Sequence, residues 1–238
     1  MEFRLLRADE IDCRISTCSE KGVSILLYKD ARCDMNILDE TVGVERWQRS
    51  HEVINGNLFC NVGISFPTDS GFDKWIWKQD VGTESYTEKE KGEASDSFKR
   101  ACFNWGIGRE LYTAPFMWVN AKDLSTLKQE GNKWTCRDSF KVTRIEYVDK
   151  KIVCVEIQNL KTKTLIEFGT PAKEVKKTED VANTPIDEAK KNVLLETMKA
   201  KGVGFLQIAE RYKLNSIDEM TVDTWMKAMS ALKKMKDV

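Results

Sequence analysis

Residues 47–66 read WQRSHEVINGNLFCNVGISF, and this stretch decides the expected fold. Asn55-Gly56 is the two-residue turn signal of a β-hairpin. After it, apolar side chains recur at every second residue from Leu58 to Phe66, the period of a half-buried strand. An aromatic-rich run, Phe72 to Val81, follows a turn at Asp69-Ser70-Gly71. We expect three strands joined as an antiparallel meander, over 47–54, 58–66 and 72–81.

A helix is expected directly after this meander. Thr87 with Glu90 has the form of a capping box, and Gly106 and Gly108 end the apolar pattern. One apolar stripe at helical spacing comprises Ala94, Phe98, Ala101, Cys102 and Trp105. Strands followed by a helix that packs on them indicate an α+β fold.

The rest of residues 1–170 adds more strands and one short helix. Two β-type runs within 14–28 are separated at Glu20-Lys21-Gly22, and residues 31–42 have a helical pattern that Gly43 ends. Further strands are expected over 141–148, 151–158 and 163–168.

The end of the chain changes in character. Residues 171–184 have few apolar side chains, and their composition predicts a linker. Residues 185–238 form a helical pattern, with Pro185 at the first position of a helix and Leu195 among the core candidates. We therefore expect a core over 1–170, a linker over 171–184 and a small helical module over 185–238.

The chain has 238 residues, and its 38 Lys and Arg balance its 38 Asp and Glu. A balanced charge excludes the uniformly basic surface of many nucleic-acid binders. Residues 1–170 carry 25 cations and 27 anions. DNA binding by this part would therefore depend on a local basic stripe.

The sequence also indicates the cellular compartment in which the protein is expected. No run approaches the roughly 18–20 consecutive apolar residues of a membrane span, and the first ten residues lack the apolar region of a signal peptide. Seven cysteines are scattered without a CxxC pair, which is typical of a reducing cytosol. We expect a cytoplasmic protein without membrane contact.

Motifs for catalysis are weak. His51 is the single histidine, so every Ser/His/Asp or Cys/His scheme depends on one residue. No Gly-x-x-x-x-Gly-Lys-Ser/Thr stretch exists, which excludes a P-loop ATPase at the motif level. Glu174-Val175-Lys176 has nuclease-like letters but lies in the expected linker, and Asp80 with Glu84 is a loose carboxylate pair. We expect no enzyme activity, catalytic residue, metal site or cofactor, with a metal nuclease as the distant alternative.

Lys99 and Arg100 lie off the apolar stripe of the expected helix. Such a pair is typical of a solvated helix face. The alternative is a phosphate clamp beside an aromatic-rich sheet, because single-strand binders combine cations that follow the backbone with aromatic faces for bases. The available aromatics, which are also candidates for core or inter-subunit packing, are Trp47, Trp75, Trp77 and Trp105.

Several of these stretches together resemble the Rad-fifty-two-type single-strand annealing proteins, in particular their phage branch known as Sak. The resemblance covers roughly residues 10–115 and more weakly extends to about 170. Its central motifs are Asp80-Val81-Gly82, Glu88-Lys89-Glu90-Lys91, ASDSFKRA at 94–101, Gly106 and Gly108. Upstream, in the same order, come Tyr28-Lys29-Asp30-Ala31-Arg32, Leu38-Asp39-Glu40, Gly43 and Trp47.

The resemblance implies a β-β-β-α core that assembles side by side into rings or helical filaments. It implies binding of single-stranded DNA by its backbone in a basic groove, and annealing of complementary strands without ATP in DNA recombination and repair. Lys99 and Arg100 match the groove-lining Lys-Arg pair, and Arg32 matches a groove arginine within one residue of spacing. Phe103 stands where eukaryotic members have a further arginine, and the loop over 82–87 is shorter.

Two hypotheses follow for the whole chain. The first is a DNA strand-annealing homo-oligomer, which a phage would express in the cytoplasm of its bacterial host. The second is a non-catalytic oligomeric adaptor, whose Trp-rich sheet serves assembly only. Under both hypotheses, residues 185–238 recruit a partner. For the strand-annealing protein, this partner would be, for example, a single-strand-binding protein. A minor DNA contact through the lysines of 185–238 is the alternative role of this module.

Overall fold

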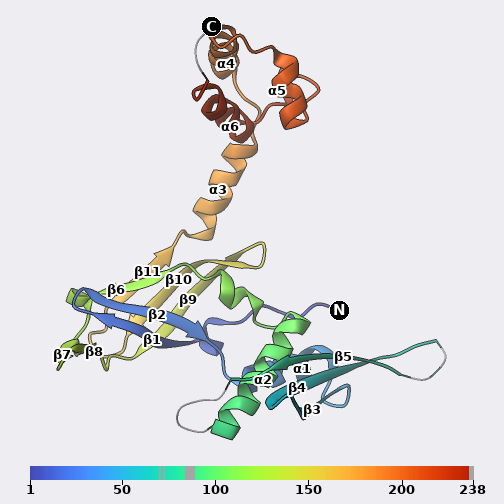
Figure 1. The fold of residues 1–238 in the computed structure, drawn as a ribbon, viewed down its shortest axis with the longest axis vertical. Helices are drawn as coiled ribbons and strands as arrows, with labels where there is room; N and C mark the ends of the chain where they lie inside the picture. Colours follow the sequence, from blue (N-terminus) through green and yellow to red (C-terminus); the bar gives the residue numbers. More distant parts are fainter. Residues whose placement is uncertain (70, 72, 84–88, 236–238) are drawn as a thin grey trace. The chain divides into compact units, whose positions relative to one another are not determined.

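The computed structural model describes residues 1–69, 71, 73–83 and 89–235 (Figure 1). The expected α+β class is confirmed, with helices and antiparallel sheets in one chain. The contacts divide it into two compact units, Met1–Ala172 and Lys173–Val238. No helix of the described residues is both long enough and apolar enough to cross a bilayer.

The larger sheet of the first unit has six strands in the order β11-β10-β9-β1-β2-β6, all antiparallel to their neighbours. Its strands are β1 (Asp12–Ser19), β2 (Gly22–Tyr28), β6 (Met117–Asn120), β9 (Phe140–Val148), β10 (Lys151–Asn159) and β11 (Leu165–Gly169). Five of them were expected from sequence. β6 was missed, because four residues are too few to show a period.

The second sheet has the order β3-β4-β5, with β3 at Trp47–Ile54, β4 at Asn57–Phe66 and β5 at Lys74–Val81. Asn55 and Gly56 turn the first hairpin with φ of 52° and 79°. Both positions of this turn type need positive φ, which Asn and Gly tolerate. The expected third strand began at Phe72, which lies outside the described residues.

Two helices of the first unit are α1 (Ala31–Val42) and α2 (Lys89–Trp105). Asp30 caps α1, since its carboxylate accepts hydrogen bonds from the backbone N–H of Arg32 and Cys33. The apolar stripe of α2 packs on β4 and β5, and Phe98, Ala101 and Cys102 are fully buried there. Thr87, the expected first member of the capping box, lies outside the described residues.

Short elements complete the first unit: η1 (Ala8–Glu10), η2 (Arg109–Thr113), η3 (Ala121–Asp123), β7 (Lys128–Glu130) and β8 (Lys133–Thr135). Asp138 ties the chain after η3 to β10. Its carboxylate accepts hydrogen bonds from Ser125 N–H and Oγ (2.8 and 2.9 Å) and from Asn159 Nδ2 (2.7 Å). Burial opposes ionisation, but these bonds and one from Thr126 outweigh it and lower the pKa of Asp138 to about 2.

The second unit is helical throughout its regular structure: α3 (Ala172–Asn183), α4 (Glu188–Ala200), α5 (Phe205–Tyr212), η4 (Ile217–Glu219) and α6 (Val222–Leu232). Its core includes Leu194, Ile208, Met220 and Leu232. Leu195, expected in this core, is instead exposed, because it faces away from the packed side of α4.

Two expectations for this region need correction. Most of the expected linker over 171–184 is helix α3, because its Lys, Glu and Ala favour helix and Pro171 precedes its first turn. Helix α4 begins three residues after Pro185, with Asp187 as its N-cap accepting from the Lys190 N–H. Pro185 pairs with Thr221 instead. The functional boundaries over 1–170, 171–184 and 185–238 stay predictions.

Candidate nucleic-acid interface

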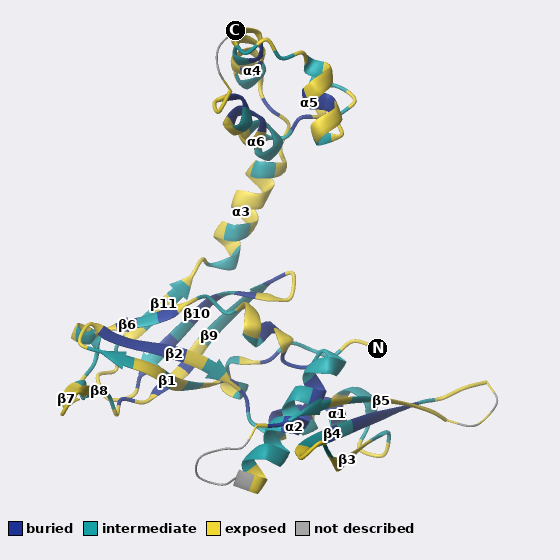
Figure 2. Cartoon of the chain, in the orientation of Figure 1, coloured by how far each residue is buried: buried dark blue, intermediate teal, exposed yellow. Residues whose placement is uncertain are grey.

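A groove of about 1060 Å³ lies in the first unit, on the outer face of β2. Its walls come from α2, from η2 and from the segment that leads into β6. Alternate residues of β2 point to opposite faces, so Val23 and Ile25 enter the core while Leu26 and Tyr28 are exposed. Figure 2 shows β2 buried along part of its length and exposed along another part. The groove therefore has a sheet floor and a helical wall.

Lys99 and Arg14 are the accessible cations of the groove. Lys99 stands on the α2 wall, and Arg14 lies on β1 directly across from Leu26 of β2. Within the described part of the chain, neither side chain forms an ion pair. Asp96 also lines the groove, but its Oδ2 accepts hydrogen bonds from the Thr83 N–H and Oγ1 at 3.1 and 3.0 Å. The groove is thus mildly basic in a single chain.

The buried side chain of Lys29 forms part of the floor of the groove. Its ammonium bonds both carboxylate oxygens of Asp34, and the side chains are 1% and 0% exposed. Burial raises the pKa of Asp34 to about 6, against the opposing effect of the Lys29 ammonium. This ion pair neutralises Lys29, so Lys29 shapes the floor and the accessible positive charge belongs to Lys99 and Arg14.

Gly108 allows Lys29 to take this position. Its φ is +74°, and a Cβ there would lie 2.2 Å from Lys29 Cε. Phe103 packs on the same side chain, with the Lys29 ammonium 4.5 Å from its ring centroid. Phe103 stands where the resemblance has an arginine in eukaryotic members, and here it is part of the groove wall.

Aromatic side chains line the rest of the groove. Tyr28 comes from β2, Phe103 from α2, Tyr112 from η2 and Phe116 from the residue before β6. Tyr112 and Phe116 are 73% and 78% exposed, unusually high for large apolar side chains of a folded unit. The combination of aromatic faces and unpaired cations suits an unpaired nucleic-acid strand.

The other two predicted site residues do not line this groove. Arg100 is 40% exposed and turns to β5, where its Nη2 lies 3.3 Å from Asp80 Oδ1. Arg32, at the start of α1, is 85% exposed, and its Nε lies 3.0 Å from Asp30 Oδ2. The structure therefore separates the predicted set: Lys99 faces the groove, Arg100 faces β5, and Arg32 stands at a helix end.

The four candidate tryptophans also divide. Trp47 stacks on Phe98 and donates to Asp39 Oδ1 at 2.6 Å, and Trp105 donates to the Val62 carbonyl at 3.0 Å. Both pack in the first unit. Trp75 and Trp77 stack on each other, 5.9 Å between centroids, and remain partly exposed on β5.

Residues weighed for catalysis are dispersed. His51 lies on β3, 3.2 Å from the Ala94 carbonyl oxygen, and Glu84 lies outside the described residues. Among the side chains that the structure describes, no three His, Cys, Asp or Glu gather as metal ligands.

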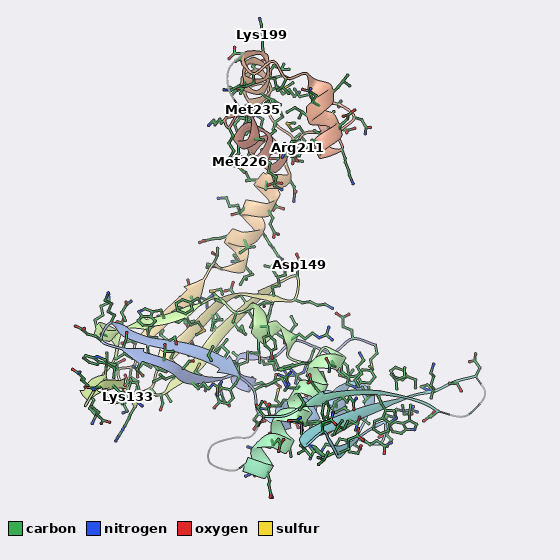
Figure 3. All side chains as sticks on the ribbon, in the orientation of Figure 1. Lys133, Asp149, Lys199, Arg211, Met226 and Met235 are labelled. Carbon is green, nitrogen blue, oxygen red and sulfur yellow. The ribbon has the colours of Figure 1, made fainter. Side chains whose placement is uncertain are left out.

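A second, smaller groove of about 510 Å³ belongs to the second unit. It is lined by Arg211 and Tyr212 of α5, by Met226 and Lys227 of α6, and by Lys234; Arg211 and Met226 are labelled in Figure 3. Lys227 is paired with Asp223 at 2.6 Å, whereas Arg211 and Lys234 have no acidic partner among residues 173–235.

Sequence reasoning missed Arg14, Tyr112 and Phe116. The alternation of β1 could have placed Arg14 on an exposed face, but only the sheet order sets that face beside α2. Tyr112 lies in the short 3-10 helix η2 and Phe116 in the irregular chain after Pro115, and neither stretch is long enough for a period to mark these side chains. No protein-family model matches the chain, and no curated protein matches it.

Proposed function

We propose that the chain binds single-stranded DNA and anneals complementary strands without ATP, as a non-enzymatic oligomer in DNA recombination and repair. The observation that carries this proposal is one groove that combines four aromatic side chains with Lys99 and Arg14, two cations that form no ion pair among the described residues. Cations hold the phosphates and aromatic faces accept bases, so the groove suits a strand whose bases are unpaired.

The arrangement of elements supports membership of the Rad-fifty-two type. We assign the sheet β3-β4-β5 and the helix α2 that packs on it to the β-β-β-α core of that family. Lys99 of the matched Lys-Arg pair lines the groove. The proposed phosphate contacts are Lys99 and Arg14 first, with Arg100 and Arg32 contributing less because Asp80 and Asp30 lie beside them.

Assembly into a ring or helical filament would make this mild groove effective. One strand that crosses many copies meets the same two cations repeatedly, and linked weak contacts add up to tight binding. The sheet β3-β4-β5 has two edge strands, and its edge strand β5 carries the exposed Trp75, Ile76 and Trp77. Unpaired edges and exposed apolar side chains favour contact with another copy.

Residues 185–238 are proposed to recruit a partner, such as a single-strand-binding protein. The groove between α5 and α6 offers Arg211 and Lys234, which have no acidic partner among residues 173–235, beside the exposed side chain of Met226. These features fit an acidic partner segment with an apolar side chain.

The second candidate function is an oligomeric adaptor that does not bind DNA. The exposed Trp75 and Trp77 and the groove of the second unit favour it, since both serve protein contacts as well. Fluorescence anisotropy of a labelled single-stranded oligonucleotide across a salt series separates the two. Annealing predicts salt-dependent binding that Lys99→Ala weakens, and the adaptor predicts no binding at any salt concentration.

A further inference from the structure

Tyr112 and Phe116 are the two most exposed aromatic side chains of the first unit's described part, and both line the groove. Exposure of large apolar surface is costly, so two such side chains on one groove indicate a surface with an occupant. Tyr112 lies in η2 and Phe116 directly precedes β6, and Lys99 of α2 and Arg14 of β1 line the same groove.

Other rings hold both side chains in place. Tyr112 meets Phe103 edge to face, with 5.3 Å between centroids and an interplanar angle of 74°. Phe116 stacks on Trp118, with 6.5 Å between centroids and an angle of 18°. Each aromatic ring is therefore supported on one side and open to the groove on another. A rigid aromatic face binds at a low cost in conformational entropy.

We propose that Tyr112 and Phe116 form a base-binding subsite that takes one unpaired base from the strand held at Lys99 and Arg14. The inference rests on the proposed binding of single-stranded DNA and adds the place where one base of the bound strand stacks. A flat nucleobase stacks on an aromatic face whatever its sequence, so the subsite recognises the unpaired state and no particular base.

A base held in this subsite is withdrawn from pairing, whereas its neighbours along the strand stay available. One base per chain therefore marks the register of the strand on the protein. A base in a duplex is stacked and paired, so it would have to be flipped out at a cost before it could enter. The subsite accordingly favours single strands over duplexes, beyond the effect of phosphate charge.

Two probes of equal length and charge test this: fluorescein-labelled oligothymidylate, and the same chain built wholly from abasic sites. The full-length protein should bind oligothymidylate at least about fivefold more tightly, the lower range for one stacked base. The double variant Tyr112→Leu/Phe116→Leu keeps apolar bulk but has no flat rings. It should bind both probes with equal affinity, and its affinity for the abasic chain should equal that of the natural protein. Lys99→Ala should weaken both probes by the same factor and preserve the ratio.

Three results would overturn the subsite while leaving the proposed function intact. The first is equal affinity of the natural protein for both probes. The second is that the double leucine variant weakens the binding of both probes equally. The third is that the double leucine variant sediments as dissociated chains where the natural protein sediments as an oligomer. The last would make this face a contact between copies. Binding of neither probe would instead overturn the proposed function itself. Tyr112→Phe/Phe116→Tyr keeps both rings and should retain the full ratio, which controls for misfolding.

Discussion

The guanidinium Nη2 of Arg100 lies 3.3 Å from Oδ1 of Asp80, while the preceding residue, Lys99, faces the groove and forms no ion pair with any residue that the structure describes. Adjacent residues of a helix point about 100° apart, so two cations next to each other in sequence reach different surroundings. Lys99 is free to meet a phosphate. Arg100 must first give up part of its contact with Asp80.

The first prediction ranks the three matched cations. Lys99→Ala, Arg100→Ala and Arg32→Ala should each weaken binding of single-stranded DNA, with the largest loss for Lys99→Ala. Each phosphate contact removed lowers the magnitude of the slope of log K against log salt by about 0.7. Anisotropy titrations at four salt concentrations measure the slope. Three variants with natural affinity would refute the assignment of these cations to DNA.

The second prediction releases Arg100 from its partner. Asp80→Asn removes the charge that competes with phosphate, so affinity for single strands should rise and the salt slope should steepen. The pair is partly exposed, so stability should change by less than about 1 kcal/mol. The matched control is Asp80→Asn/Arg100→Ala, which should show no gain. If the double variant gained as much affinity, the cause would be the change in the protein's net charge and not the release of Arg100.

The third prediction concerns the ion pair under the groove. Lys29→Met leaves the Asp34 carboxylate buried without its partner and should cost about 3–5 kcal/mol in the free energy of unfolding. Lys29→Met/Asp34→Leu replaces the pair with apolar side chains and should recover most of this loss. Urea unfolding of the single and double variants gives the coupling energy. Additive losses would show that the two charges do not depend on each other.

The fourth prediction is a pH dependence of stability. The pKa of Asp34 is about 6 in the folded protein and near 4 when unfolded, so the folded state binds more protons in between. Its contribution to the free energy of unfolding should therefore fall as pH rises from about 4 to 6. The pKa of Asp138 is shifted in the opposite direction, and Asp138 is present in both proteins. The measured quantity is therefore the difference in the free energy of unfolding between the natural protein and Asp34→Asn at each pH. A difference independent of pH over this range would contradict the shift.

The fifth prediction concerns the helical module. A chain ending at residue 172 should still form oligomers and anneal bare oligonucleotides, because the groove and the sheets of the described chain lie in the first unit. It should fail on strands precoated with the cognate single-strand-binding protein. Arg211→Glu in the full chain should reproduce that failure if the groove of the second unit makes the contact. Loss of bare-strand annealing on truncation would show that the module belongs to the annealing core.

Local structure was largely predictable from the sequence. The hairpin at Asn55-Gly56, the helix ended by Gly43 and the apolar stripe of α2 all follow from short-range rules of turn, cap and period, and the structure confirms each. Helix α3 was missed because most of its residues are charged or polar, with only Ala172, Val175, Val181 and Ala182 apolar, and such a composition is typical of a linker whether or not it is helical.

The groove was only partly predictable. Lys99 follows from its position off the stripe of α2, but its neighbours come from β1, η2 and the start of β6. Their meeting depends on the sheet order, which places β9 beside β1 and β6 beside β2. No pattern within one segment encodes such a long-range pairing. The same limit explains Arg100, whose partner Asp80 lies 20 residues away on β5.

Annealing itself tests the central claim most directly. Two complementary oligonucleotides, one with a fluorophore and one with a quencher, are mixed in EDTA without nucleotide, with the natural protein or with Arg14→Ala/Lys99→Ala. We predict that the natural protein accelerates quenching well above the spontaneous rate, and that the double variant loses most of this acceleration while keeping its fold by circular dichroism. No acceleration by the natural protein, or full acceleration by the double variant, would contradict the account.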